Sequence, residues 1–445
     1  MRIARYLDEG WQDIALLADG MLCAGLNART EAERQQSLES AARVQAHLAH
    51  SNPLTQVLDI RRGEDGAGCQ AMVLSHPLMV GRWLVAISFT GTTRHLADWL
   101  DNLKIEQEDG FHQGFLRLTR QFEAQCGQIA MPCLGAALSR PGLTLAGVLD
   151  MLKYERSPVS LVVTGHSQGA ALMQIFIAHL LQNGVLPQYV LGCGFASPCV
   201  AGARTLKNAD YPIYHIVHAD DAVPRIGGAM HLGLCRVMPD TPALRGLCYG
   251  ARSQDPIFNE LLCLQHTVRG TRGALCFFIA LLRLLCVVPE EDAELLYRAL
   301  APAFLPGMLQ SRLVGYARRL VGSALRRLES RYAACFGEMD MQQLERYTRW
   351  LQSLFARYGM RETLSRLPDA LHMPHMLYRI DTLCAYDVIS GAAPRRLLPA
   401  LWSGDESPVW DQRPPRAPAP VRRPAYDRFH PLSGQRRTAQ RRKML

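Results

Sequence analysis

The fold that we expect is decided by one stretch, Ser160-Leu-Val-Val-Thr-Gly165-His166-Ser167-Gln168-Gly169, and by the apolar run that follows it. Residues 160–164 are rich in β-branched side chains and carry no charge, which predicts a short buried strand. Residues 170–181 are apolar and contain good helix formers, which predicts a helix. The sequence G-x-S-x-G lies between the two, so the pattern is a strand, a tight turn and a helix.

This arrangement is typical of a nucleophile elbow, in which a serine occupies a strained strand-to-helix turn. The flanking Gly165 and Gly169 remove side chains that would collide there. The Ser167 hydroxyl then stands over the helix N-terminus, and the next backbone N–H, on Gln168, can stabilise an oxyanion. A bare G-x-S-x-G is common by chance, so the strand before it and the helix after it carry the weight of the prediction.

The charge of the chain is concentrated at its C-terminal end. The 445 residues are 48% hydrophobic and 20% charged, which is ordinary for a globular protein, and the formal net charge is +9. Residues 413–445 hold ten Lys or Arg and one acidic residue, and the rest of the chain is formally neutral. We therefore expect no nucleic-acid partner. Residues 394–445, rich in Pro and Arg with few apolar side chains, are predicted to form a disordered tail.

Cysteine usage and hydropathy bear on location. The 13 cysteines form no C-x-x-C pair, and several, such as Cys193, Cys276 and Cys286, lie in apolar runs, which favours buried free thiols in a reducing compartment. The first ten residues lack the apolar core of a signal peptide. The apolar run 273–288 is short and contains Arg283, so it indicates a buried or interfacial helix rather than a membrane span. We expect a cytoplasmic protein that can contact a lipid surface peripherally.

The order of the predicted elements indicates an α/β fold. Alternating strands and helices predict a mostly parallel sheet covered on both faces. The predicted strands are residues 54–61, 69–75, 83–89, 160–164, 189–195 and 213–217. We divide the chain into a core with N-terminal helices (1–239), a helical insertion or cap (240–367), a return to the core with the catalytic histidine (368–393) and the tail. The predicted helices of the insertion are 256–266, 273–287, 290–300, 308–329 and 341–358.

Residues 50–240, with a short piece near 372, resemble the class 3 lipase family of α/β-hydrolases. The motifs that carry the resemblance are Phe89-Thr90-Gly91-Thr92 with Asp98-Trp99, His112-x-Gly114-Phe115, Gly165-His166-Ser167-Gln168-Gly169, Phe195-Ala-Ser-Pro198, Asp221-Ala-Val-Pro224 and His231-x-Gly233. Three positions depart from the family pattern: Thr90 and Cys199 replace arginines, and Gln168 replaces the commonest leucine. The departures indicate a divergent member.

The resemblance implies hydrolysis of carboxylic esters in acyl lipids (triacylglycerol, diacylglycerol or phospholipid) by a Ser-His-Asp triad, without a cofactor. A phospholipase or acyltransferase variant of the same chemistry is one alternative. A non-catalytic α/β-hydrolase fold that serves as an interaction module is another. The helical region 240–367 has two readings, a mobile lid that opens on lipid or a rigid cap that narrows the pocket.

Ser167 is the predicted nucleophile, and it needs a base and an orienting carboxylate. Asp221 follows a predicted strand, precedes a proline turn and comes after the serine in the chain, as this fold requires of the acid. Its neighbour Asp220 is the competitor, and the register of the V-P motif favours Asp221. The predicted oxyanion donors are the backbone N–H groups of Gln168 and Thr92.

The histidine must follow the acid, and five histidines do so: His231, His266, His372, His375 and His430. His231 fits a structural position of the family motif, and His430 lies in the tail. We favour His372, because Pro374 suits the first turn of the last long helix and would leave His372 on the loop that enters it. His375 is the alternative, and His266 is a third candidate. The pair His372-x-x-His375 alone does not indicate a metal site.

Overall fold

The computed structural model describes residues 56–60, 71–79, 81–89, 107–202, 211–227, 230–238, 245–246, 249–268, 270–287 and 314–376. The predicted N-terminal helices, the predicted helix 290–300, the predicted oxyanion residue Thr92 and the tail 394–445 with His430 lie outside these residues.

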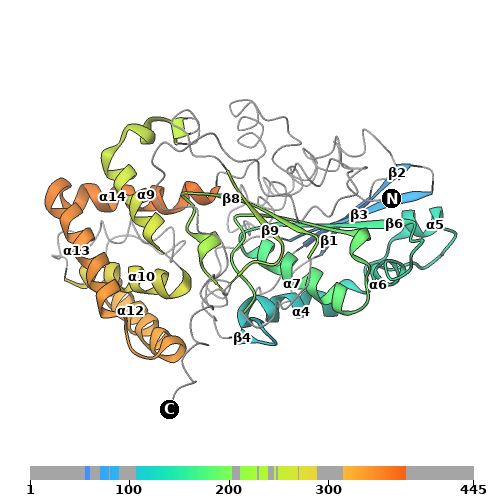
Figure 1. The fold of residues 1–445 in the computed structure, drawn as a ribbon, viewed down its shortest axis with the longest axis horizontal. Coiled ribbons are helices and arrows are strands. Elements are labelled where there is room, and N and C mark those ends of the chain that lie inside the picture. The colour runs from blue at the N-terminus through green and yellow to red at the C-terminus, as the bar shows by residue number, and fades with distance from the viewer. Residues whose placement is uncertain are drawn as a thin grey trace, which may run out of the picture. The chain divides into compact units, whose positions relative to one another are not determined.

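A mostly parallel sheet organises the described part of the core (Figure 1). Its strands are β1 (Gln56–Ile60), β2 (Ala71–Met79), β3 (Arg82–Phe89), β6 (Val159–His166), β7 (Val190–Phe195), β8 (Ile213–His218) and β9 (Leu234–Met238), in that spatial order. The first two pairings, β1 with β2 and β2 with β3, are antiparallel. Every pairing from β3 to β9 is parallel. This sheet confirms the predicted fold class.

The parallel strands place the candidate chemistry at one edge. The strands β3, β6 and β8 end at Phe89, His166 and His218, directly before the loops that hold the predicted site residues. In parallel sheets the carboxyl ends of the strands share an edge, where ligands bind. All six predicted strands are present. The strand β9 and a small hairpin of β4 (Gln107–Glu108) with β5 (Phe111–His112) were not predicted.

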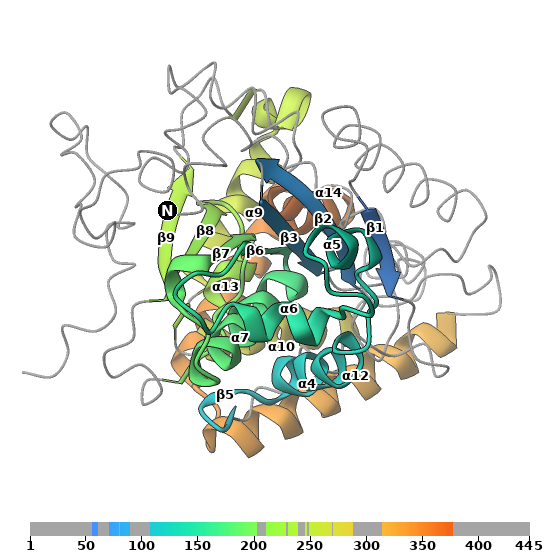
Figure 2. The ribbon, with the colours of Figure 1, turned by 90° about the vertical axis from the view of Figure 1, so that its right-hand side faces the viewer.

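Helices cover the sheet through one apolar cluster. They are α4 (Gln113–Cys126), α5 (Pro132–Ala137), α6 (Leu145–Met151) and α7 (Gln168–Gln182). The helix α7 packs against β6 and β7, and α4 packs against α7 (Figure 2). The rings of Phe89, Phe122 and Phe176 meet edge to face with centroids 4.7–5.8 Å apart, and so join β3, α4 and α7. The elbow therefore rests on a packed three-element core.

The second group of helices has its own apolar cluster (Figure 1). Its members are α9 (Pro256–Thr267), α10 (Gly270–Cys286), α12 (Val314–Phe336), α13 (Met341–Tyr358) and α14 (Met360–His372). Helix α13 has the predicted bounds, and α9 and α10 differ from the prediction by at most three residues. Ile226, from the loop after β8, packs against this cluster. No helix within the described ranges is long and apolar enough to cross a membrane.

Two local predictions are wrong. His372 is not on a loop but is the last residue of α14, and Pro374 opens a single 3-10 turn, η6 (Pro374–Met376). Burial of Leu364, Leu367 and Ala370 holds α14 in place even though Pro368 lies inside it. Cys286 is exposed at the end of α10, whereas Cys193 and Cys276 are buried as predicted.

Candidate active site

The serine of the elbow has a strained backbone. Ser167 has φ 55° and ψ −123°, a positive φ that non-glycine residues rarely adopt. Its N–H donates to the carbonyl of Phe195 on β7 at 2.9 Å, and its carbonyl accepts from Ala170 N–H on α7 at 3.0 Å. The strand beside it and the helix after it thus hold the residue in this conformation. This is the backbone geometry predicted from the motif.

The glycines of the elbow are required by close backbone contact. A Cβ on Gly165 would lie 2.3 Å from the carbonyl carbon of Gly169 and 2.7 Å from the nitrogen of Ala170. Those distances are far below van der Waals contact, so the strand can meet the helix only because residue 165 has no side chain. Gln168 begins α7 directly after the serine, so its backbone N–H belongs to the first turn, where N–H groups lack partners within the helix.

The structure brings Asp221 and His375 together. Asp221 follows β8 and is 2% exposed, and its Oδ1 accepts the Val223 N–H at 3.0 Å. The Nδ1 of His375 donates to Asp221 Oδ2 at 3.1 Å, although the two residues are 154 positions apart in the chain. A carboxylate on Nδ1 fixes the tautomer that leaves Nε2 able to accept a proton.

His375 also contacts the elbow itself. The Nε2 of His166, the residue before the serine, donates to the backbone carbonyl of His375 at 2.9 Å. The two imidazole rings lie with their centroids 4.7 Å apart. The structure therefore places His375 against both Asp221 and the residue adjoining Ser167, whereas His372, the residue favoured from the sequence, ends α14.

Asp220 forms a second buried cluster beside the acid. It is fully buried, and its carboxylate accepts from Tyr249 Oη at 2.7 Å, from Arg245 Nη2 at 3.2 Å and from His266 Nε2. Burial opposes its charge, but the hydrogen bond from His266, the charges of His218 and His266 and the hydrogen bond from Tyr249 outweigh burial and lower the pKa of Asp220 to about 2. Asp220 is thus a fixed negative charge between the sheet and the second group of helices.

His231 has a structural environment, as the motif suggested. Its Nε2 donates to the carbonyl of Ser197 at 2.6 Å, and its Nδ1 lies 3.6 Å from the Cys199 sulfur. Burial lowers the pKa of His231 to about 4, so it is neutral at pH 7. Cys199, which replaces the family's arginine, therefore packs against this histidine.

Three residues near the site were missed from the sequence. His166 was visible inside the G-H-S motif but was not considered for a role of its own. Tyr249 and Arg245 lie in no motif, and only their contacts with Asp220 reveal them. Among the described residues, no group of three or more His, Cys, Asp or Glu is arranged to hold a metal ion.

The mostly parallel sheet, with the strained serine turn at its carboxyl edge, has the architecture of the α/β-hydrolase fold. Residues 86–230 match the model of the family described as Lipase (class 3). This match confirms the resemblance read from the motifs over the segment that contains the elbow and the acid. No curated protein sequence matches the chain.

Two of the solved structures that are similar to this chain are fungal lipases. The Rhizomucor miehei triacylglyceride lipase shares 17% identity over 52% of this chain and 80% of its own, with a TM-score of 0.37. Lipase II from Rhizopus niveus shares 15% identity over 49% of this chain and 74% of its own, with a TM-score of 0.32.

Proposed function

We propose that this protein is a serine hydrolase that cleaves carboxylic esters of acyl lipids with Ser167, His375 and Asp221 as its triad. The observation that carries the proposal is the hydrogen bond from His375 Nδ1 to Asp221, formed beside a strained Ser167 elbow. The family match over residues 86–230 supports the substrate class, an ester of a fatty acid with a glycerol-type alcohol.

The mechanism follows from the roles of the three side chains. His375 Nε2 takes the proton of the Ser167 hydroxyl while the serine oxygen attacks the ester carbonyl carbon. The tetrahedral intermediate collapses, the ester C–O bond breaks, and the imidazolium gives its proton to the departing alcohol. A water molecule then loses a proton to His375 and attacks the acyl carbon. The bond between that carbon and the Ser167 oxygen breaks, His375 returns the proton to the serine, and the fatty acid leaves. Asp221 stabilises the imidazolium throughout.

The oxyanion of both tetrahedral intermediates needs positioned N–H donors. Gln168 supplies one from the first turn of α7, and the N–H of Thr92 is the second donor in this proposal. The proposed base is His375 rather than His372. Its support is that the same residue contacts Asp221 through its ring and His166 through its carbonyl.

The test compares four proteins on p-nitrophenyl butyrate and p-nitrophenyl palmitate. We expect Ser167→Ala and His375→Ala each to lower kcat by about 10⁴-fold or more, because the triad acts as a unit. We expect His372→Ala to retain most of the activity. If Ser167→Ala keeps the kcat of wild type, the proposal is contradicted. If kcat is lost in His372→Ala and kept in His375→Ala, the base is His372.

Covalent labelling gives a second readout with a matched control. A fluorophosphonate reacts only with an activated serine, so it should label wild type on the peptide that contains Ser167 and leave Ser167→Ala unlabelled. Ser353 is an exposed serine on α13, and Ser353→Ala should be labelled like wild type. A folded wild type that neither hydrolyses the esters nor reacts with the probe would indicate an interaction module that has kept the fold.

A further inference from the structure

We propose that α9 positions the catalytic base. In this proposal, Gln265 and His266 of α9 link two parts of the site: the turn that contains Asp221, and α14, the helix that leads to His375. This inference rests on the proposed function for its kinetic consequence. Both residues lie in the last turns of α9, within the helical region that the motifs do not reach. They are positioning residues, because they act through Asp220, Arg225 and α14 rather than on the substrate.

Gln265 connects both sides through two of its groups. Its backbone carbonyl accepts from Arg225 Nη1 at 2.9 Å, and Arg225 also donates to the carbonyl of Ala219 on the acid turn. Its side-chain amide donates to the carbonyl of Ala370 on α14. Gln265 is 3% exposed and Arg225 8% exposed. Water cannot replace such buried hydrogen bonds, so losing one leaves a polar group without a partner.

His266 adds a second connection to the same turn. Its Nε2 donates to the carboxylate of Asp220, the residue directly before the acid. The main-chain N–H of Asp220 donates to His218 Nδ1 at 3.1 Å, which anchors the turn to the end of β8. The turn is therefore held from the sheet on one side and from α9 on the other.

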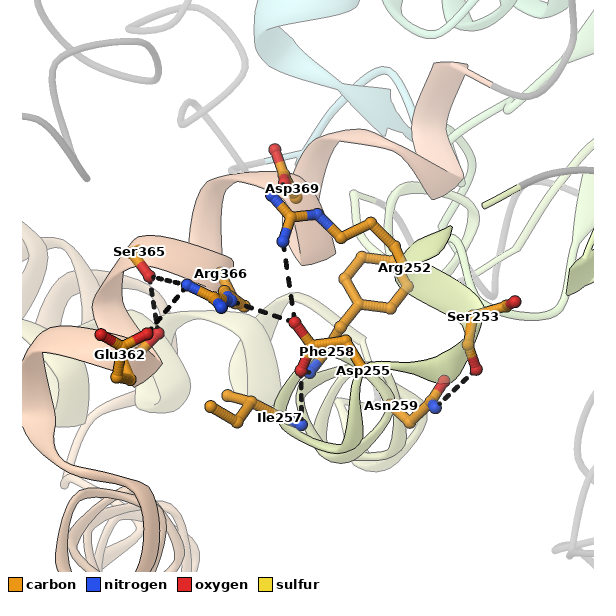
Figure 3. A network of polar contacts seen from close by, with 10 residues as sticks. All are labelled: Arg252, Ser253, Asp255, Ile257, Phe258, Asn259, Glu362, Ser365, Arg366 and Asp369. Atoms are coloured by element: carbon orange, nitrogen blue, oxygen red, sulfur yellow. Dashed lines mark hydrogen bonds and ion pairs between the residues drawn. The ribbon is translucent and has the colours of Figure 1, made fainter. Parts of the chain in front are cut away.

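The first turn of α9 is tied to α14 as well (Figure 3). Asp255 caps α9 by accepting the Ile257 N–H at 2.9 Å, and its other oxygen accepts from Arg366 Nε at 3.0 Å. Arg252 pairs with Asp369 at 2.7 Å. Because α14 contacts α9 at both ends of α9, the two helices are held as one unit.

The helix α14 delivers the base with little intervening chain. The N–H of Met373 donates to the carbonyl of Asp369 at 2.8 Å, and His375 follows two residues later on the 3-10 turn. A displacement of α14 therefore moves His375 relative to Asp221. Misplacing a catalytic group by about 1 Å can cost about 100-fold in rate.

The experiment uses Gln265→Met, which keeps the length of the side chain and removes the donor to Ala370. We expect kcat on p-nitrophenyl butyrate to fall by about 10- to 100-fold while KM changes less than threefold, since the ester site itself is untouched. A second pair of variants, His266→Gln and His266→Leu, tests the hydrogen bond between His266 and Asp220 by the same measurement of kcat and KM. The glutamine keeps a donor for Asp220 and should restore activity that the leucine loses.

The matched control is Tyr332→Phe, which removes a buried hydroxyl from α12. That hydroxyl accepts from Arg272 and from the Asp340 N–H, contacts within the same group of helices that involve no residue of α14 or α9. Its kcat should equal that of wild type at a temperature where circular dichroism shows both proteins fully folded. Equal losses in Gln265→Met and Tyr332→Phe would overturn the inference, because they would reflect stability alone.

Hydrogen exchange measures the positioning without catalysis. In Gln265→Met, amides of residues 371–376 and 219–226 should exchange faster than in wild type, and in Tyr332→Phe they should not. Unchanged exchange in Gln265→Met overturns the inference even if the protein hydrolyses esters. Faster exchange in a protein without esterase activity supports the positioning and rejects the proposed function.

Discussion

Two neighbouring carboxylates on one turn each hold a histidine, and the two pairs differ in their surroundings. Asp220 receives three side-chain donors, from His266, Tyr249 and Arg245, and is fully buried. Asp221 pairs with His375, whose side chain is 16% exposed and lies beside the elbow. One pair lies between packed elements, and the other lies beside His166 of the elbow.

The difference shows how two adjacent residues of the same type can have different roles, one structural and one in catalysis. A carboxylate surrounded by donors keeps its charge and holds elements together, since every hydrogen bond to it favours the charged form. A carboxylate on Nδ1 of a partly exposed histidine beside a serine can orient a base. The surroundings, rather than the residue type, separate the structural aspartate from the proposed catalytic one.

The largest expected effect comes from Asp221→Asn. Asparagine keeps the shape but favours the wrong tautomer of His375, so kcat should fall by about 10⁴-fold while the fold is retained. Steady-state kinetics on p-nitrophenyl butyrate, with circular dichroism as the check on folding, measures it. Activity within tenfold of wild type would mean that the two pairs do not differ as proposed.

Asp220→Asn should reverse the pattern, with a loss of stability larger than its loss of activity. Removing one partner of a buried charged cluster costs about 3 kcal/mol of unfolding free energy. Chemical denaturation at pH 7 measures the loss, and kcat of the folded protein should stay within about tenfold of wild type. A larger fall in kcat than in Asp221→Asn would exchange the roles of the two carboxylates.

In Asp220→Asn, the free energy of unfolding should also depend less on pH below pH 5 than it does in wild type. The pKa of Asp220 is about 2 in the folded protein, below its ordinary 3.8, so its stabilisation is present above pH 4 and is lost as pH falls through about 2. Wild type should lose about 2 kcal/mol from this residue across that window. Urea midpoints from pH 5 to pH 2 should show this loss in wild type and its absence in Asp220→Asn.

The smallest expected effect tests whether the contact between the start of α9 and α14 influences kcat, separately from its influence on stability. Asp255 and Asp340 both cap helices, α9 and α13, by accepting backbone N–H groups of the first turn. Each alanine variant should lose about 1 kcal/mol of stability. Only Asp255→Ala, which also releases Arg366 of α14, should lower kcat, by a few fold. Equal kcat in the two variants would show that the start of α9 does not influence the proposed catalytic pair.

The elbow and the turn that contains Asp221 were predictable because their signals are contiguous in the chain. The run 160–164 and the glycines at 165 and 169 contain the strand, the turn and its steric requirement within ten residues. Asp221 likewise lies three residues after the end of its strand. The sheet was predictable for the same reason, except for β9, whose five residues include Arg236 and give only a weak strand signal.

The histidine was less predictable because its position depends on contacts distant in sequence. Pro374 correctly indicated the start of a helical turn, but it gave no sign that α14 continues to His372 through Pro368. Tertiary packing of α14 on α9 overrides the local effect of that proline. Asp221 and His375 meet only through this packing.

The separation of 154 residues between Asp221 and His375 also has a consequence during synthesis. At about 5 to 20 residues per second, the ribosome needs roughly 8 to 30 s to pass from the acid to the histidine. During that interval the nascent chain already contains Ser167 and Asp221 but not the proposed base. Under the proposed function, a growing chain would therefore begin to cleave esters only after the helical region, through α14, has left the ribosome and folded.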